Sequence, residues 1–120
     1  MCYNKIKQLN QKAVIKMNED VIQEMVNAIR TKFNPEQIIV FGSWARGEAN
    51  EDSDIDFLVI MPDEIPNKRF LQIEIRKALR GFAIPKDVVV LSKNEISKYK
   101  NINGLVYKNA LEEGRVYYGR

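Results

Sequence analysis

The fold is decided by residues 42–59, which read GSWARGEANEDSDIDFLV. This stretch starts directly after the apolar run QIIVF at 37–41 and ends inside a second run, IDFLVIM at 55–61. Apolar runs of this length are typical of buried strands. The second run is apolar at nearly every position, which predicts a central strand covered on both faces.

The glycine end of the stretch suggests a phosphate-binding turn. Gly42 breaks the first strand, and we expect a helix to begin just after Ser43. Backbone amides at a helix N-terminus bind phosphate because the amides and the helix dipole both favour negative charge. Gly42 permits close backbone approach, Ser43 adds a hydroxyl donor and Arg46 adds a cation. A Gly-Ser pair taken alone is more often an ordinary strand-to-helix turn.

Carboxylates mark the start of the second strand. Asp54 and Asp56 are two residues apart, so both side chains are expected on one face of the strand. Like charges held side by side favour a cation between them, and such hard oxygen ligands suit magnesium. The alternative is a polar strand start beside Glu51-Asp52, which explains one aspartate better than two.

A third carboxylate, Asp87, opens the apolar run DVVVL at 87–91 and is expected to come alongside the first two. Its alternative role is that of a turn or cap residue after Pro85-Lys86. Three carboxylates beside a phosphate-binding turn are suited to metal-assisted phosphoryl or nucleotidyl transfer.

Helical patterns alternate with the strands. Asn18 is a good N-cap for a helix whose apolar stripe ends at Phe33, before the break at Asn34-Pro35. The remaining expected elements are a helix over 67–80, a short helix capped by Ser92 around Glu95, a helix over 105–113 and an edge strand over 116–118. This order predicts an α/β (α+β) fold, a small mixed β-sheet flanked by helices. Residues 1–17 form an unassigned N-terminal extension, and residues 18–120 form a single domain.

The amino-acid composition excludes several kinds of catalytic and metal site. The chain has 120 residues, no histidine and one cysteine. Catalysis by an imidazole base, a Ser-His-Asp triad, a disulfide framework and zinc sites built on histidine or clustered cysteine are therefore excluded. The net charge of +3 is too small for a dedicated nucleic-acid binder, so nucleic acid is an unexpected partner. No apolar run is long enough for a membrane span or a signal peptide, which predicts a cytoplasmic protein without a membrane partner.

The quoted stretch resembles the signature of the DNA polymerase β-like nucleotidyltransferases: Gly-Ser, a helical turn with Ala-Arg-Gly, then Ser-Asp-x-Asp. The run KDVVVLS at 86–92 resembles the strand that carries the third carboxylate. The short chain is similar to the minimal nucleotidyltransferase (MNT) group, often paired as antitoxin with a toxin of the HEPN family. The resemblance extends from about Asp20 to Tyr118 and implies the polymerase β-like nucleotidyltransferase fold.

The resemblance also implies roles for residues. Gly42 and Ser43 would hold the β- and γ-phosphates of ATP, the default nucleotide. Asp54 and Asp56 would ligate two Mg²⁺ ions, and Asp87 would complete the metal site and help to deprotonate the acceptor hydroxyl. Arg46 would touch phosphate or brace the acidic loop.

The acceptor that the resemblance implies is a tyrosine of a HEPN-domain partner, which would receive AMP and be neutralised. Two alternatives remain open. The protein is a catalytically silent binding module that neutralises its partner by occlusion, or it adenylylates a small molecule. Candidate docking surfaces in a homo- or hetero-oligomer are the apolar residues Leu105, Val106 and Tyr117 and the N-terminal segment. For Leu105 and Val106, the favoured interpretation is ordinary core packing.

Overall fold

The structure, a computed structural model, describes residues 19–45, 47, 53–99 and 106–119, with backbone only for Tyr99 and residues 106–109. The predicted N-terminal extension, Leu105, the side chain of Val106 and the predicted cap Asn18 lie outside the described residues. Among the described helices, none combines the length and apolarity that a membrane crossing requires.

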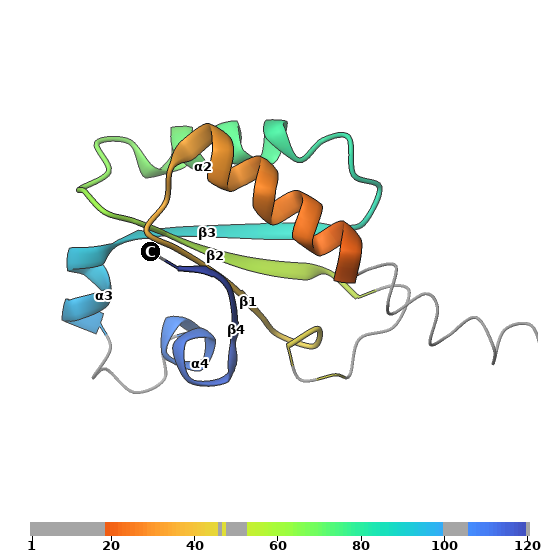
Figure 1. Cartoon of the computed structure of the whole chain (residues 1–120). Helices are drawn as coiled ribbons and strands as arrows, with labels where there is room; N and C mark the ends of the chain where they lie inside the picture. The colour runs from red at the N-terminus through yellow and green to blue at the C-terminus, as the bar shows by residue number, and fades with distance from the viewer. Residues whose placement is uncertain (1–18, 46, 48–52, 100–105, 120) are drawn as a thin grey trace, which may run out of the picture.

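A mixed four-stranded sheet forms the centre of the molecule (Figure 1). The strands lie in the order β3-β2-β1-β4, with β1 antiparallel to both β2 and β4 and with β2 parallel to β3. Parallel neighbours require a long crossover connection, which the helix α2 supplies between β2 and β3. The strands are β1 (Gln37–Phe41), β2 (Ile55–Met61), β3 (Lys86–Ser92) and β4 (Arg115–Gly119).

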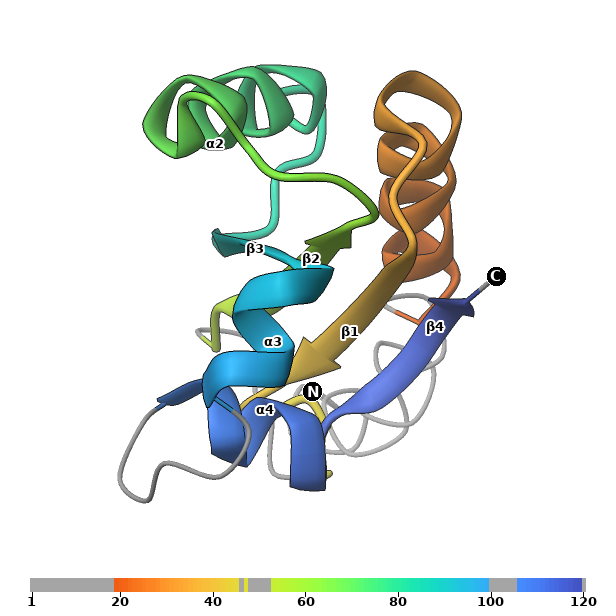
Figure 2. The same ribbon diagram turned by 90° about the vertical axis from the view of Figure 1, so that its left-hand side faces the viewer.

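Helices cover both faces of the sheet, as Figure 2 shows. The helix of residues 19–33 and α2 (Lys68–Ala78) pack on one face, and α3 (Lys93–Tyr99) and α4 (Val106–Glu113) lie on the other. The predicted α/β fold with a small mixed sheet is confirmed.

The central strand β2 contributes side chains to both layers of the core. Ile55, Phe57 and Val59 pack with the helix of residues 19–33 and α2, whereas Leu58 and Ile60 pack towards α3 and α4. All five side chains are buried. The unbroken apolar run therefore arises because each face of β2 has its own layer of helices.

Local signals in the sequence fix the ends of the helices. The helix of residues 19–33 ends at Asn34, which has a φ of 50° and is followed by Pro35. The Asn67 side chain accepts a hydrogen bond of 3.0 Å from the Phe70 amide and begins α2. At α3, Ser92 and Glu95 bond each other's backbone amides reciprocally, which is a capping box.

Candidate active site

The candidate site lies at the end of the sheet where β1 stops and where β2 and β3 begin (Figure 1). Gly42 follows β1 with a φ of 80°, a left-handed conformation that favours glycine. Residues 42–45 form turns, and the Gly47 amide donates to the Trp44 carbonyl oxygen at 3.3 Å. The expectation that a helix begins just after Ser43 is therefore wrong for residues 42–45, because the chain turns sharply between two glycines with positive φ.

Gly42 packs directly against one of the predicted metal ligands. A Cβ atom at Gly42 would stand 2.3 Å from Oδ2 of Asp56. That distance is shorter than any ordinary contact, so a side chain at position 42 would displace the Asp56 carboxylate or the turn. Gly42 is thus required by its conformation and also by the space that Asp56 occupies.

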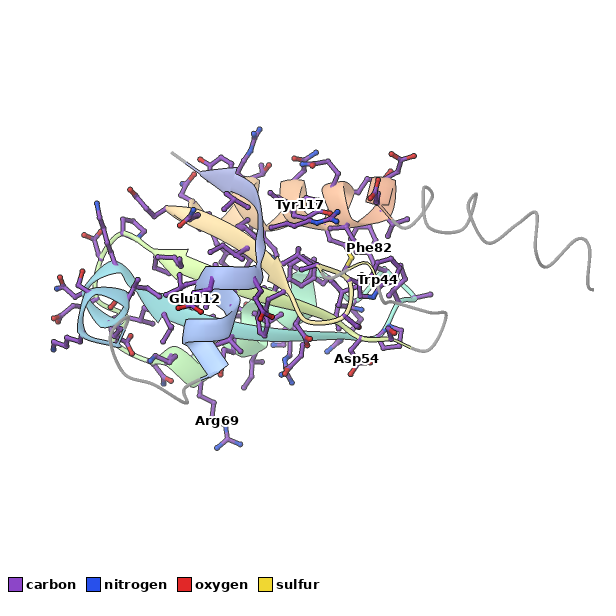
Figure 3. The ribbon with its side chains drawn as sticks, turned by 90° about the horizontal axis from the view of Figure 1, so that it is seen from below. Trp44, Asp54, Arg69, Phe82, Glu112 and Tyr117 are labelled. Carbon is purple, nitrogen blue, oxygen red and sulfur yellow. The ribbon has the colours of Figure 1, made fainter. Side chains whose placement is uncertain are left out.

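Two of the residues that carry the predicted carboxylates are partners on neighbouring strands. Asp56 has Phe41 as its Cα partner on β1 and Asp87 as its Cα partner on β3. Neighbouring strands lie about 4.8 Å apart. Asp54 precedes β2 by one residue, is exposed, and lies at the same end of the sheet as Trp44 in Figure 3. The structure therefore brings Asp54, Asp56 and Asp87 to one end of the sheet, as predicted.

The side chain of Asp87 is engaged by α2. Its Oδ1 accepts a 2.6 Å bond from Nη2 of Arg76 and a 3.0 Å bond from the amide of Val88. Within the described residues, no three His, Cys, Asp or Glu side chains gather closely enough to hold a metal ion. Placement of Asp87 among the metal ligands therefore stays a prediction.

The sequence alone does not predict the contact between Arg76 and Asp87. Arg76 is one of several cations on the polar side of α2, and no spacing rule separates it from Lys77 or Arg80. Its partner becomes visible only when α2 packs beside β3. Arg46, the other predicted cation, lies outside the described residues.

Trp44 closes the connection between the two strands. Its side chain packs against the larger core cluster, and Nε1 donates to the Ser53 carbonyl oxygen at 3.3 Å. Ala45 beside it is buried. This hydrogen bond joins Trp44, two residues after Gly42, to Ser53, the residue before Asp54, and so holds Asp54 close to the Gly42 turn.

The donor set fits magnesium on chemical grounds. Mg²⁺ in nucleotide sites is held by one or two carboxylates together with substrate phosphates and waters. Asp54 and Asp56 supply two carboxylates at the start of β2, and the absence of a side chain at Gly42 lets the turn approach the Asp56 carboxylate closely. A protein cage of three or more ligands is not needed for this kind of site.

Comparison with known proteins agrees with this geometry. Residues 22–117 match the family model described as "Nucleotidyltransferase domain". The chain belongs to this nucleotidyltransferase family. The match confirms the resemblance drawn from residues 42–59 and makes the protein an enzyme by family.

Curated relatives of this nucleotidyltransferase are similar along most of its length. "Putative protein adenylyltransferase MJ0604" of Methanocaldococcus jannaschii is 36% identical over 105 residues, covering 85% of this chain and 100% of the relative. "Protein adenylyltransferase MntA" of Thermococcus cleftensis is 39% identical over 84 residues, covering 67% of this chain and 82% of the relative. These names agree with the resemblance to the MNT group.

A solved structure shares the fold. It contains a tri-AMPylated Shewanella oneidensis HEPN toxin in complex with its MNT antitoxin, and it matches with a TM-score of 0.52 and 19% identity. The match covers 88% of this chain and 73% of that one. At this identity the likeness concerns the fold of the nucleotidyltransferase alone.

Proposed function

We propose that this nucleotidyltransferase moves AMP from ATP to a hydroxyl group, a tyrosine of a HEPN-domain partner, and so acts as an antitoxin. One observation carries the proposal: Asp54 and Asp56 lie at a strand end, with Asp56 against the Gly42 turn, in a chain of this family. The adenylyltransferase names of two relatives and the AMPylated toxin bound by the structural neighbour support the choice of AMP and of the partner.

The residues of the site would divide the work. The Gly42-Ser43 turn would bind the β- and γ-phosphates through backbone amides and the Ser43 hydroxyl. Asp54 and Asp56 would hold Mg²⁺, which neutralises phosphate charge and stabilises the attacking and leaving oxygens. The acceptor oxygen would form a bond to the α-phosphorus while the bond to pyrophosphate breaks. Asp87 would take the hydroxyl proton.

The test is transfer to the purified HEPN partner with ATP and Mg²⁺, read by mass spectrometry. We expect an AMP-sized mass on one tyrosine. Asp87→Asn should abolish transfer, leave nucleotide binding largely intact and leave the complex with the partner intact, because Asp87 serves the acceptor side. A partner that is neutralised by the wild-type protein without any added mass would overturn the enzymatic proposal.

One observation favours a second candidate function, neutralisation of the partner by occlusion alone. Asp87 is paired with Arg76, and the described residues contain no cluster of three metal ligands. Under this alternative, Asp87→Asn neutralises the partner as well as the wild type does. The same mass-spectrometric and neutralisation assays separate the two functions.

A further inference from the structure

Arg76 is the one described cation in direct contact with a predicted carboxylate of the site. It lies on α2, a helix that packs on the sheet face opposite α3 and α4, and its guanidinium meets Asp87 at the start of the edge strand β3. Arg76 therefore links α2 to the carboxylate on which transfer would depend.

We propose that Arg76 is a positioning residue that competes with the divalent cation for Asp87. In the cation-free protein, Arg76 holds the Asp87 carboxylate on the α2 side. A cation bound at Asp54 and Asp56 attracts this carboxylate away from Arg76 and towards itself. The inference rests on the proposed function, because it assumes that Asp87 serves the site built around Asp56.

The contacts of Asp87 carry the first step of the argument. Its Oδ1 is shared between Arg76 at 2.6 Å and the Val88 amide at 3.0 Å, so this oxygen already accepts two hydrogen bonds. Asp56 and Asp87 are nevertheless Cα partners on neighbouring strands. A modest side-chain rotation, without movement of the strands, would bring the two carboxylates to the same cation.

The solvent exposure of the Arg76–Asp87 ion pair is the second observation that supports competition with a cation. The side chains of Arg76 and Asp87 are each 55% exposed. Ion pairs that are this open to solvent are weak, so a divalent cation can displace the guanidinium. Without Arg76, the Asp87 carboxylate would lose this cationic partner beside Asp56, and the added negative charge favours binding of a cation. Loss of Arg76 is therefore expected to tighten Mg²⁺ binding by about two- to five-fold, the range that a weak ion pair allows.

The experiment titrates Mg²⁺ alone into the nucleotide-free protein at constant ionic strength, with binding followed by calorimetry. Arg76→Gln is compared with Arg80→Gln, which removes the same charge just past the end of α2, at a residue without a described contact to Asp87. We expect Arg76→Gln to tighten binding by about two- to five-fold and Arg80→Gln to change it by much less. Arg76→Lys keeps a cation at the position and should return affinity towards the wild-type value.

A double-mutant cycle isolates the path of the effect. In an Asp87→Asn background, Arg76→Gln should leave Mg²⁺ affinity unchanged, because the carboxylate for which Arg76 and the cation compete is gone. Equal tightening in both backgrounds would mean a general charge effect and would overturn the inference. If Mg²⁺ binding depends on Asp56 but is unchanged by Arg76→Gln, the inference is overturned and the proposed metal site stands. Binding that Asp56→Asn does not weaken would refute the proposed metal site itself.

Discussion

Gly42 shows how tightly one position is constrained by its neighbour. Its φ of 80° is unfavourable for any residue with a side chain, and its missing Cβ is the space filled by the Asp56 carboxylate. Gly47 has a similar φ of 73° but no atom within 4 Å of an added Cβ. The two glycines therefore separate the cost of backbone conformation from the cost of crowding the site.

Gly42→Ala and Gly47→Ala form a matched pair of substitutions. Both should lose about 1–2 kcal/mol of unfolding free energy through left-handed strain. Gly42→Ala should lose more, and it alone should weaken Mg²⁺-dependent nucleotide binding, because Asp56 must move. Denaturant unfolding and nucleotide titration of both variants measure these effects, and equal behaviour of the two would show that the turn is purely structural.

At the residue scale, the sequence predicted what a local motif can encode. Gly42, Asp54 and Asp56 sit within one short segment, and the alternation of a strand places the two aspartates together. The ion pair between Arg76 and Asp87 could not be predicted from the sequence, because it depends on how α2 packs beside β3 and not on any spacing along the chain.

At the scale of elements, α3 illustrates a short helix secured by its first turn. Ser92 Oγ accepts from the Glu95 amide at 3.1 Å, and Glu95 Oε1 accepts from the Ser92 amide at 3.2 Å. The Glu95 carboxylate is also paired with Lys68 at the start of α2. Burial alone would raise the pKa of Glu95, but the bonds from Lys68 and Ser92 outweigh it and hold the pKa below its usual value.

Glu95→Gln is therefore expected to destabilise the protein in a pH-dependent way. A carboxyl whose folded pKa is lowered contributes stability above its unfolded pKa and loses it as the pH falls through the folded pKa. The substitution should cost on the order of 1 kcal/mol at pH 7, with the difference from wild type shrinking below about pH 4. Urea unfolding across this range measures it.

The control for this prediction is Glu74→Gln, which removes a partly exposed carboxylate paired with the exposed Lys77 on α2. Its effect should stay within about 0.5 kcal/mol at every pH, as for most exposed pairs. A pH-independent loss in Glu95→Gln would contradict the role given to its charge.

The elements themselves were largely predictable. The strands over 37–41 and 55–61 match β1 and β2, because buried strands have to be apolar wherever helices cover both sides. The expectation that a helix begins just after Ser43 was wrong for residues 42–45, which form turns. In the structure, the Gly47 amide donates to the Trp44 carbonyl oxygen, and Gly47 has a positive φ.

On the scale of the whole molecule, the sheet has two different ends. The carboxylates occupy the end where β2 begins. At the other end, where β2 finishes, an open hollow of about 430 Å³ is lined by residues that include Phe33, Met61, Ile65 and Leu71. The proposed chemistry belongs to the first end, because the hollow contains no phosphate-binding turn among its described lining residues.

Ligand binding should be visible in global stability, because a ligand that binds only the native state stabilises it by mass action. ATP with Mg²⁺ should raise the melting temperature far more than either one alone. The double variant Asp54→Asn/Asp56→Asn keeps the shape of the side chains and removes their charge, so the magnesium-dependent part of the shift should vanish. A full shift in that variant would remove these residues from the metal site.

The parallel pairing of β2 with β3 has a consequence for the order in which the molecule assembles. Asp56 and Asp87 meet only after the chain between them has folded back, and such distant contacts form slowly because loop closure must come first. Helices form from local contacts and appear earlier, and none of the three predicted carboxylates lies on a helix. Trp44 is the single tryptophan of the chain, and its anchor to Ser53 forms with the strand ends. During refolding, tryptophan fluorescence should therefore lag behind the helical signal in circular dichroism, and the candidate active site should be among the last parts of the protein to form.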